Sequence, residues 1–148
     1  MQRTSTAAPT AGPTTPARPD DPAVVLSIPA DKTLVVLVRS AASHLGSRVG
    51  LSLEELDDLR LAVTEACTLF LILDEGAPIG GPLECRFVEI GGALHIGIAA
   101  EVPPESPQSV VGFGWDLLAT LVDDLRWESG GQRAVVRFSK GPVRRGPR

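Results

Sequence analysis

A single glutamate lies inside an apolar stretch of the chain that has helical spacing. Glu65 falls in the run from Asp57 to Leu69, and at 100° per residue it shares one helical face with mostly aliphatic side chains. The other members of that face are Asp58, Leu61, Leu69 and Ile72. A carboxylate among aliphatic residues is unusual for a solvated helix side, which makes Glu65 a candidate site residue. The alternative is an ordinary surface position with a few aliphatic neighbours.

A glycine pair, Gly112 and Gly114, provides the second candidate for chemistry. It stands just before the apolar run that begins at Trp115. Backbone amides at a helix N-terminus can bind anions such as phosphate. Asp116 in the first turn would compete electrostatically with such an anion. The alternative is a helix entry that simply needs the conformational freedom of glycine.

Metal chemistry is not predicted from the remaining candidate ligands. Cys67 and Cys85 are the only cysteines, and neither has a metal-ligand neighbour at short spacing. Buried, unreactive thiols are the usual state of such positions, and a redox-sensing pair is the alternative. His44 and His95 stand alone in the sequence. We therefore expect no metal site.

Length and charge limit the function classes. The chain has 148 residues, which fits one domain, and its net charge is −4. A nucleic-acid surface needs clustered Lys and Arg, so we expect no nucleic-acid partner. No apolar run approaches the ~20 residues of a membrane span, and the N-terminus lacks the apolar core of a signal peptide. A cytoplasmic protein that does not contact membranes is the simplest expectation.

Composition divides the chain into three parts. Residues 1–21 consist largely of Thr, Ala and Pro and cannot bury enough apolar surface to fold, so they are predicted to be a disordered tail. Residues 22–139 carry the periodic apolar patterns of a folded domain. Residues 140–148, rich in Gly, Pro and Arg, are predicted to be a second disordered tail.

The first half of the domain predicts one strand and two helices. The strand covers residues 24–28, and Asp31 is a candidate N-cap for a helix from Lys32 to about Arg48. Ser52 and Glu55 form a capping-box pattern, so the second helix should begin at Leu53 and stop by Gly76. The predicted apolar face of the first helix comprises Leu34, Leu37, Val38, Ala41 and Leu45.

The second half predicts two hairpins separated by a helix. Alternating strands over 83–88 and 93–98 are joined at Gly91 and Gly92, and a proline-broken loop covers 101–109. A helix is predicted from about Trp115 to Leu125, followed by a hairpin around Gly130 and Gly131 that closes with a strand over 134–138. The order β-α-α-β-β-α-β-β favours an α+β fold, a two-layer sandwich. Its sheet should be mixed but mostly antiparallel, with helices on one face.

The run from Leu59 to Thr68 resembles the signature helix of bacterial anti-sigma factors of the RsbW-like group. The order of elements and the run Gly112-Phe113-Gly114 support the resemblance, which covers residues 24–138. It implies a histidine-kinase-like ATPase fold. It also implies that Glu65 occupies the place of the general base, which polarises the hydroxyl that attacks the γ-phosphate of ATP.

The chain departs from the family pattern at the ligands of the nucleotide. The family has an Asn four residues after the Glu, which holds magnesium. Leu69 stands there instead, and the chain contains no asparagine. The family's Asp-x-Gly-x-Gly run aligns with residues 100–104, which puts Ala100 in the place of the Asp and prolines near the glycines. A shift by one residue would put Glu101 at the acidic position. Gly112 and Gly114 match the phosphate-binding glycines in place and spacing.

The resemblance implies a regulatory function. Members of the group bind a sigma factor and an anti-anti-sigma protein, which active members phosphorylate on serine, and they can form homodimers. We therefore predict an anti-sigma-factor-like protein with a degenerate ATP site, no cofactor, and Glu65 as a vestigial base. One alternative is an active ATP-dependent serine kinase of an anti-anti-sigma factor, with ATP and magnesium held by altered ligands such as Asp58 or Asp74.

Two further predictions concern function and partners. A stand-alone α/β ligand-binding module unrelated to sigma factors is a third possible function. For the partner surface, the first helix offers a mixed polar and apolar patch beside its core face, made by Val35, Arg39 and Ser43.

Overall fold

The computed structural model describes residues 22–73, 81–103 and 112–143. The predicted tail over 1–21 lies outside the described residues, as does most of the predicted loop over 101–109 and of the tail over 140–148. The division of the chain at these boundaries stays a prediction. The described elements are β1 (Val24–Ile28), the short 3-10 turn η1 (Lys32–Leu34), α1 (Val35–Arg48), α2 (Leu53–Leu73), β2 (Leu83–Ile90), β3 (Ala93–Glu101), α3 (Phe113–Leu121), β4 (Asp123–Gly130) and β5 (Arg133–Lys140).

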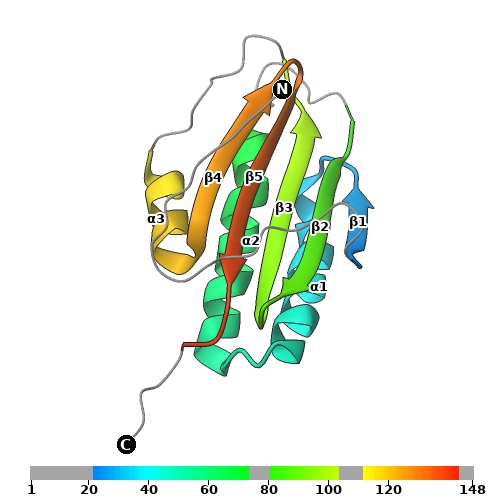
Figure 1. The fold of residues 1–148 in the computed structure, drawn as a ribbon. Helices are drawn as coiled ribbons and strands as arrows, with labels where there is room; N and C mark the ends of the chain where they lie inside the picture. The colour runs from blue at the N-terminus through cyan, green and yellow to red at the C-terminus, as the bar shows by residue number, and fades with distance from the viewer. Residues whose placement is uncertain (1–21, 74–80, 104–111, 144–148) are drawn as a thin grey trace, which may run out of the picture.

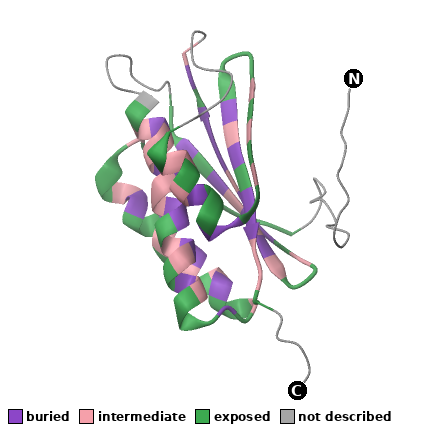
Figure 2. Cartoon of the chain, turned by 90° about the vertical axis from the view of Figure 1, so that its left-hand side faces the viewer, coloured by how far each residue is buried: buried purple, intermediate pink, exposed green. Residues whose placement is uncertain are grey.

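The strands form one sheet in the order β1-β2-β3-β5-β4, and every neighbouring pair is antiparallel (Figure 1). Gly91 and Gly92 have φ of 59° and 83°, the left-handed values that a two-residue hairpin turn requires. The helices lie on one side of the sheet, so the domain has two layers (Figure 2). The predicted fold class and order of elements are confirmed.

The core fills the space between the sheet and α2. Leu59, Val63 and Phe70 are fully buried on the sheet-facing side of this helix. They belong to one cluster with Ile98 of β3 and Phe138 of β5. Figure 2 shows the buried residues concentrated where the helices and the sheet meet. The α2 helix runs behind the middle of the sheet and also contacts α3 (Figure 1).

The capping box fixes where α2 begins. The N–H of Ser52 donates to the Glu55 carboxylate at 2.8 Å, and the N–H of Glu55 donates to the Ser52 hydroxyl at 3.1 Å. Glu55 also accepts the N–H of Val143 at 2.7 Å, which ties the chain after β5 to the start of α2. The two backbone donors lower the pKa of Glu55. The predicted start at Leu53 is confirmed.

The predicted apolar face of α1 is confirmed except at Leu37. Val38 is buried, and Leu34, Ala41 and Leu45 are partly buried against the core, whereas Leu37 is 49% exposed. The buried positions of the helix are Val35, Val38, Ala42 and Gly46, so the centre of the buried face lies to one side of the predicted one. Gly46, which carries no apolar side chain, occupies a core position. The predicted partner patch is also corrected at Val35, which is 4% exposed and belongs to the core.

The helix predicted over Trp115 to Leu125 ends four residues early. The α3 helix stops at Leu121, Val122 is extended (φ −139°, ψ 175°), and β4 begins at Asp123. The apolar residues of the segment keep a helical spacing into β4. The pairing register with β5 shifts between Asp123 and Arg126, where Asp124 has a φ of 54°, so the apolar and polar residues at the start of β4 do not alternate regularly. Pairing with β5 along the sheet decides the outcome, because it satisfies the backbone of the segment.

Candidate functional site

The structure brings three of the predicted site residues together, at the contact between α2 and α3. Glu65 and Leu69 are half-buried residues one turn apart on α2. Glu65 Oε1 lies 3.2 Å from the position that a Cβ atom on Gly114 would take, and Leu69 Cδ2 lies 3.9 Å from it. A side chain on Gly114 would therefore press against the carboxylate, so glycine permits the close approach of the two helices.

Gly112, the other glycine at the start of α3, is required by its backbone conformation. Gly112 is the N-cap residue with φ 123° and ψ −178°, a conformation that only glycine adopts without strain. The Gly112 carbonyl accepts the N–H of Asp116 at 3.0 Å. The partial positive charge of a helix N-terminus favours a nearby anion, and here the Glu65 carboxylate lies beside the first turn.

Ala100 lies at the end of β3 on the side that faces the helices. It lies on the same face of the strand as Ile96 and Ile98, is 1% exposed, and pairs with Ala134 of β5. Glu101, the other residue considered for the acidic position, is exposed and pairs with Arg133. A buried methyl group therefore occupies the position aligned with the family's Asp, and the neighbouring carboxylate belongs to the opposite face of the strand.

The residues at these positions do not fit a magnesium–nucleotide complex. Magnesium bound to phosphates requires oxygen ligands in near-octahedral geometry. Leu69 supplies none, and its side chain instead packs against the hydrophobic core. Among the described residues, no group of three or more His, Cys, Asp or Glu side chains is placed to hold a metal ion. Asp58 is engaged near the far end of α2, 3.8 Å from Lys140 Nζ, and Asp74 lies outside the described residues.

Sequence reasoning missed an aromatic pair that connects α2 to the sheet. Phe70 of α2 stacks on Trp127 of β4, with 5.6 Å between the ring centroids and 29° between the planes. Within the part of the chain that the structure describes, the buried Trp127 indole nitrogen has no hydrogen-bond partner. The two residues are far apart in sequence, and β4 was predicted to begin as a helix. Only the correct strand boundary would have indicated the pair.

The two cysteines are neighbours in the core. Cys67 of α2 and Cys85 of β2 are fully buried and both are free thiols. A hydrogen bond with the Cys85 thiol, together with burial, raises the pKa of the Cys67 thiol far above its usual value. A neutral, enclosed thiol is a poor nucleophile. The predicted burial of both cysteines is confirmed.

This thiol pair predicts a loss of stability in alkaline solution. Because the pKa of Cys67 is higher in the folded state than in the unfolded state, stability is complete below the unfolded value of ~8.5 and falls as the pH rises above it. We expect the free energy of unfolding, measured with urea between pH 7 and pH 10, to fall with a slope that approaches about 1.4 kcal/mol per pH unit. A Cys67→Ala variant should be less stable at pH 7 and lack this slope. Rapid alkylation of both thiols by iodoacetamide in the folded protein at pH 7 would contradict the account.

The fold and this arrangement define a class of protein. An antiparallel sheet backed by helices, with a glutamate on the central helix against a glycine-led third helix, is the architecture of a histidine-kinase-like ATPase domain. The chain belongs to that family, because its residues 28–140, well over half of its length, match the family described as histidine kinase-like ATPase domain.

The most informative relatives within this family are serine-protein kinases named RsbW. The chain is 27% identical over 138 residues to the serine-protein kinase RsbW of Bacillus subtilis strain 168, covering 80% of this chain and 86% of that protein. The serine-protein kinase RsbW of Bacillus licheniformis is 28% identical over 135 residues, covering 78% and 84%. The chain is therefore an RsbW-like member of the family.

A solved structure agrees on the fold. The crystal structure of the RsbU and RsbW domains of Rv1364c from Mycobacterium tuberculosis superposes with a TM-score of 0.64 at 12% identity. The match covers 81% of this chain and 32% of that longer chain, about a third of its length. At this identity the likeness concerns the fold alone.

No helix in the three described ranges is long and apolar enough to cross a membrane.

Proposed function

We propose that the protein is an anti-sigma-factor-like regulator that binds a sigma factor, an anti-anti-sigma protein, or both, and that its ATP site is degenerate. Family membership and the likeness to the RsbW kinases support the regulatory part. The observation that carries the degenerate part is Leu69, an apolar residue packed on the core one turn from Glu65. Partner binding needs only exposed surface, so it can persist without nucleotide chemistry. A cytoplasmic location belongs to the same proposal.

The site residues have the following proposed roles. Glu65 is a vestigial general base, which now lies beside the N-terminus of α3. Leu69 occupies the position of the family's metal-binding Asn, and Ala100 that of its adenine-binding Asp. Neither side chain has an oxygen atom. Gly112 and Gly114 retain the glycine-led start of α3, for which conformation and packing are sufficient reasons.

The outer seam of the helix layer is the proposed partner surface. Arg39 of α1 donates to the Thr64 hydroxyl at 3.2 Å, and Arg60 of α2 donates to the Ser43 hydroxyl at 3.3 Å. These bonds hold two half-buried guanidinium groups along the seam. Val36 on α1, two turns before Ser43 on the same side of the helix, is 45% exposed. Arginines are enriched among the residues that carry most of the binding energy of a protein interface.

The second candidate function is an active serine kinase. It is favoured by the contact between Glu65 and Gly114, two residues that match the family pattern and that the structure brings together. A kinase would transfer labelled phosphate from ATP to a serine of its anti-anti-sigma partner. Such transfer at ordinary enzyme levels would replace the degenerate-site proposal while leaving the partners unchanged.

Partner binding is tested by titrating the full chain separately with each sigma factor and each anti-anti-sigma protein of its source organism. We expect at least one to bind at micromolar concentration or below. Val36→Glu should weaken that complex at least tenfold because it puts a charge into the apolar part of the proposed surface, whereas Leu53→Glu, at an 82% exposed position of α2, should not. Absence of binding to every candidate would contradict the regulatory function.

Homodimerisation is a further part of the proposal. The resemblance implies pairing through the sheet edge and the first helix. Val24 and Val25 of the edge strand β1 are 46% and 51% exposed on opposite faces of the sheet, which leaves apolar surface at this edge. Sedimentation velocity of the purified chain at several concentrations measures this association directly.

A further inference from the structure

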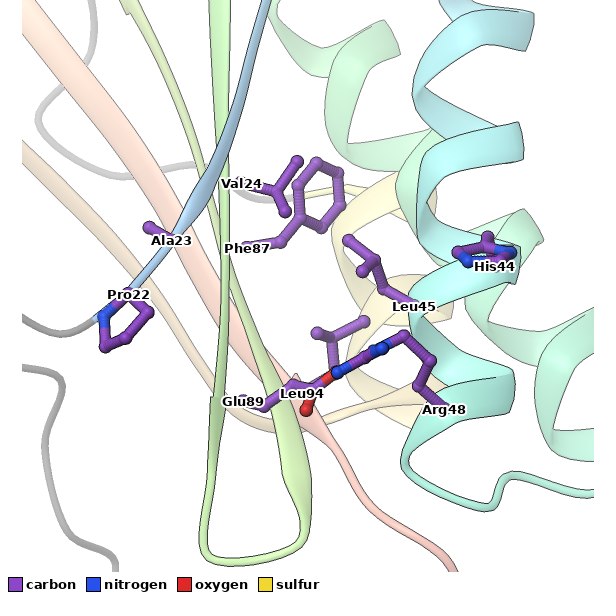
Figure 3. A pocket seen from close by; sticks show the side chains of 9 residues that line it. All are labelled: Pro22, Ala23, Val24, His44, Leu45, Arg48, Phe87, Glu89 and Leu94. Atoms are coloured by element: carbon purple, nitrogen blue, oxygen red, sulfur yellow. The ribbon is translucent and has the colours of Figure 1, made fainter.

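A second concave site lies between α1 and the first three strands, away from the contact of α2 with α3 (Figure 3). Its cavity measures about 450 Å³, within the range of small-molecule sites. Leu94 on its wall stands six residues before Ala100 along β3, roughly 20 Å at 3.3 Å per residue. The cavity is therefore separate from the positions assigned to the nucleotide.

The accessible apolar side of this cavity is formed mainly by Leu45 of α1, which is half-buried, and Val24 of β1, which is 46% exposed (Figure 3). Phe87 of β2 and Leu94 of β3 lie beneath them, are 2% and 0% exposed, and belong to the core. A ligand tail placed here would exchange water for a rigid apolar surface, which favours binding.

One end of the cavity is charged. Arg48, in the last turn of α1, reaches across to β2, where its Nε donates to Glu89 Oε2 at 2.8 Å (Figure 3). The side chains of this pair are 60% and 36% exposed, so solvent and ligands can reach them. Among the residues that the structure describes, no group accepts a hydrogen bond from the terminal nitrogens of Arg48. Glu89 thus orients the guanidinium group and leaves its terminal edge open.

We infer that this cavity binds a small amphipathic carboxylate, with the carboxylate on the terminal edge of Arg48 and the apolar tail between Leu45 and Val24. A guanidinium group presents parallel donors that match the two oxygens of a carboxylate. An amphipathic amine would meet the same cation and would have only the oxygens of Glu89 to accept its protons. A neutral amphiphile would gain the apolar contact alone.

The test compares octanoate, octylamine and octanol, which share a chain length and differ in the head group. Each is titrated into the full chain and followed by two-dimensional amide NMR. We expect octanoate to give saturable shifts at the amides of Leu45, Phe87 and Leu94, with the tightest binding of the three. Arg48→Gln should weaken octanoate about tenfold or more and leave octanol unchanged, because only the charged hydrogen bonds are lost.

Arg133→Gln is the matched control. Arg133 is a similarly exposed arginine that pairs with Glu84 at 3.1 Å, at the opposite end of β2 from Glu89, so its loss should not alter octanoate binding. The proposal is overturned by the absence of saturable shifts at the lining amides, by equal binding of octylamine, or by equal effects of the two substitutions. Shifts of the same amides with protein concentration alone would also overturn it, since they would show that the proposed homodimer covers the cavity. None of these outcomes depends on whether the chain binds ATP or a sigma factor.

Discussion

Phe70→Ala is expected to lower the free energy of unfolding by about 3–5 kcal/mol, the usual cost of removing a fully buried aromatic side chain. Phe70 is 0% exposed in the middle of the layer between α2 and the sheet. The substitution removes its burial, leaves a cavity and breaks the stacking on Trp127. Because domains of this size are stable by only about 5–15 kcal/mol, the loss should shift the melting temperature by about 10–20 °C.

Phe113→Ala provides a matched control for this prediction. Phe113 at the start of α3 is 81% exposed, so the same change of side chain should alter stability by less than about 0.5 kcal/mol. Urea unfolding followed by far-ultraviolet circular dichroism measures both variants. Similar midpoints for the two variants would contradict the assignment of Phe70 to the core.

Gly46→Val is expected to destabilise the protein by about 2–3 kcal/mol, because α1 and α2 meet at this glycine. A Cβ atom on Gly46 would lie 2.9 Å from the Cδ2 atoms of Leu56 and Leu59. It would also lie 3.0 Å from Leu51 Cδ1, so three leucines would have to move at once. Valine adds two further methyl groups to this crowding.

The control for this substitution is Gly130→Ala in the hairpin between β4 and β5. A Cβ atom there meets nothing within 4 Å, and the glycine does not require a positive φ. Its unfolding midpoint in urea should stay close to that of the unchanged protein. If Gly46→Val were equally harmless, the helices could not be packed as closely as the structure shows.

Sequence patterns predicted the elements that have strong local signals. The Ser52 and Glu55 capping box placed the start of α2, and paired glycines placed both hairpins. The patterns failed where the outcome depends on neighbours. Leu37 of α1 is exposed despite its apolar spacing, and Gly46 serves the core because of three leucines outside α1. Likewise, pairing with β5 turned residues after Leu121 into a strand despite their helical spacing.

The candidate site could be predicted in part. The family pattern selected Glu65, Leu69 and Gly114, and the structure brings these three together. Their roles stay predictions. The cavity beside α1 had no signal in the sequence, because Arg48 and Glu89 are 41 residues apart and only the pairing of helix with sheet makes them neighbours. Long-range contacts of this kind carry no local periodicity.

The loss of nucleotide binding is the central claim, and it rests on two positions. Leu69→Asn restores an oxygen ligand, and Ala100→Asp restores the acidic group. Ala100 is 1% exposed, so a carboxylate there must be paired or solvated, and the single Leu69→Asn variant is needed beside the double variant. Circular dichroism establishes that each variant is folded before it is titrated.

Isothermal titration of the purified chain with ATP and magnesium is the most direct measurement. The account predicts no binding by the unchanged chain and binding gained by the Leu69→Asn, Ala100→Asp variant. If neither protein binds, the loss of nucleotide binding stands, but these two positions are not sufficient to explain it. Binding of the unchanged chain at micromolar ATP would contradict the account and make the serine kinase the leading function.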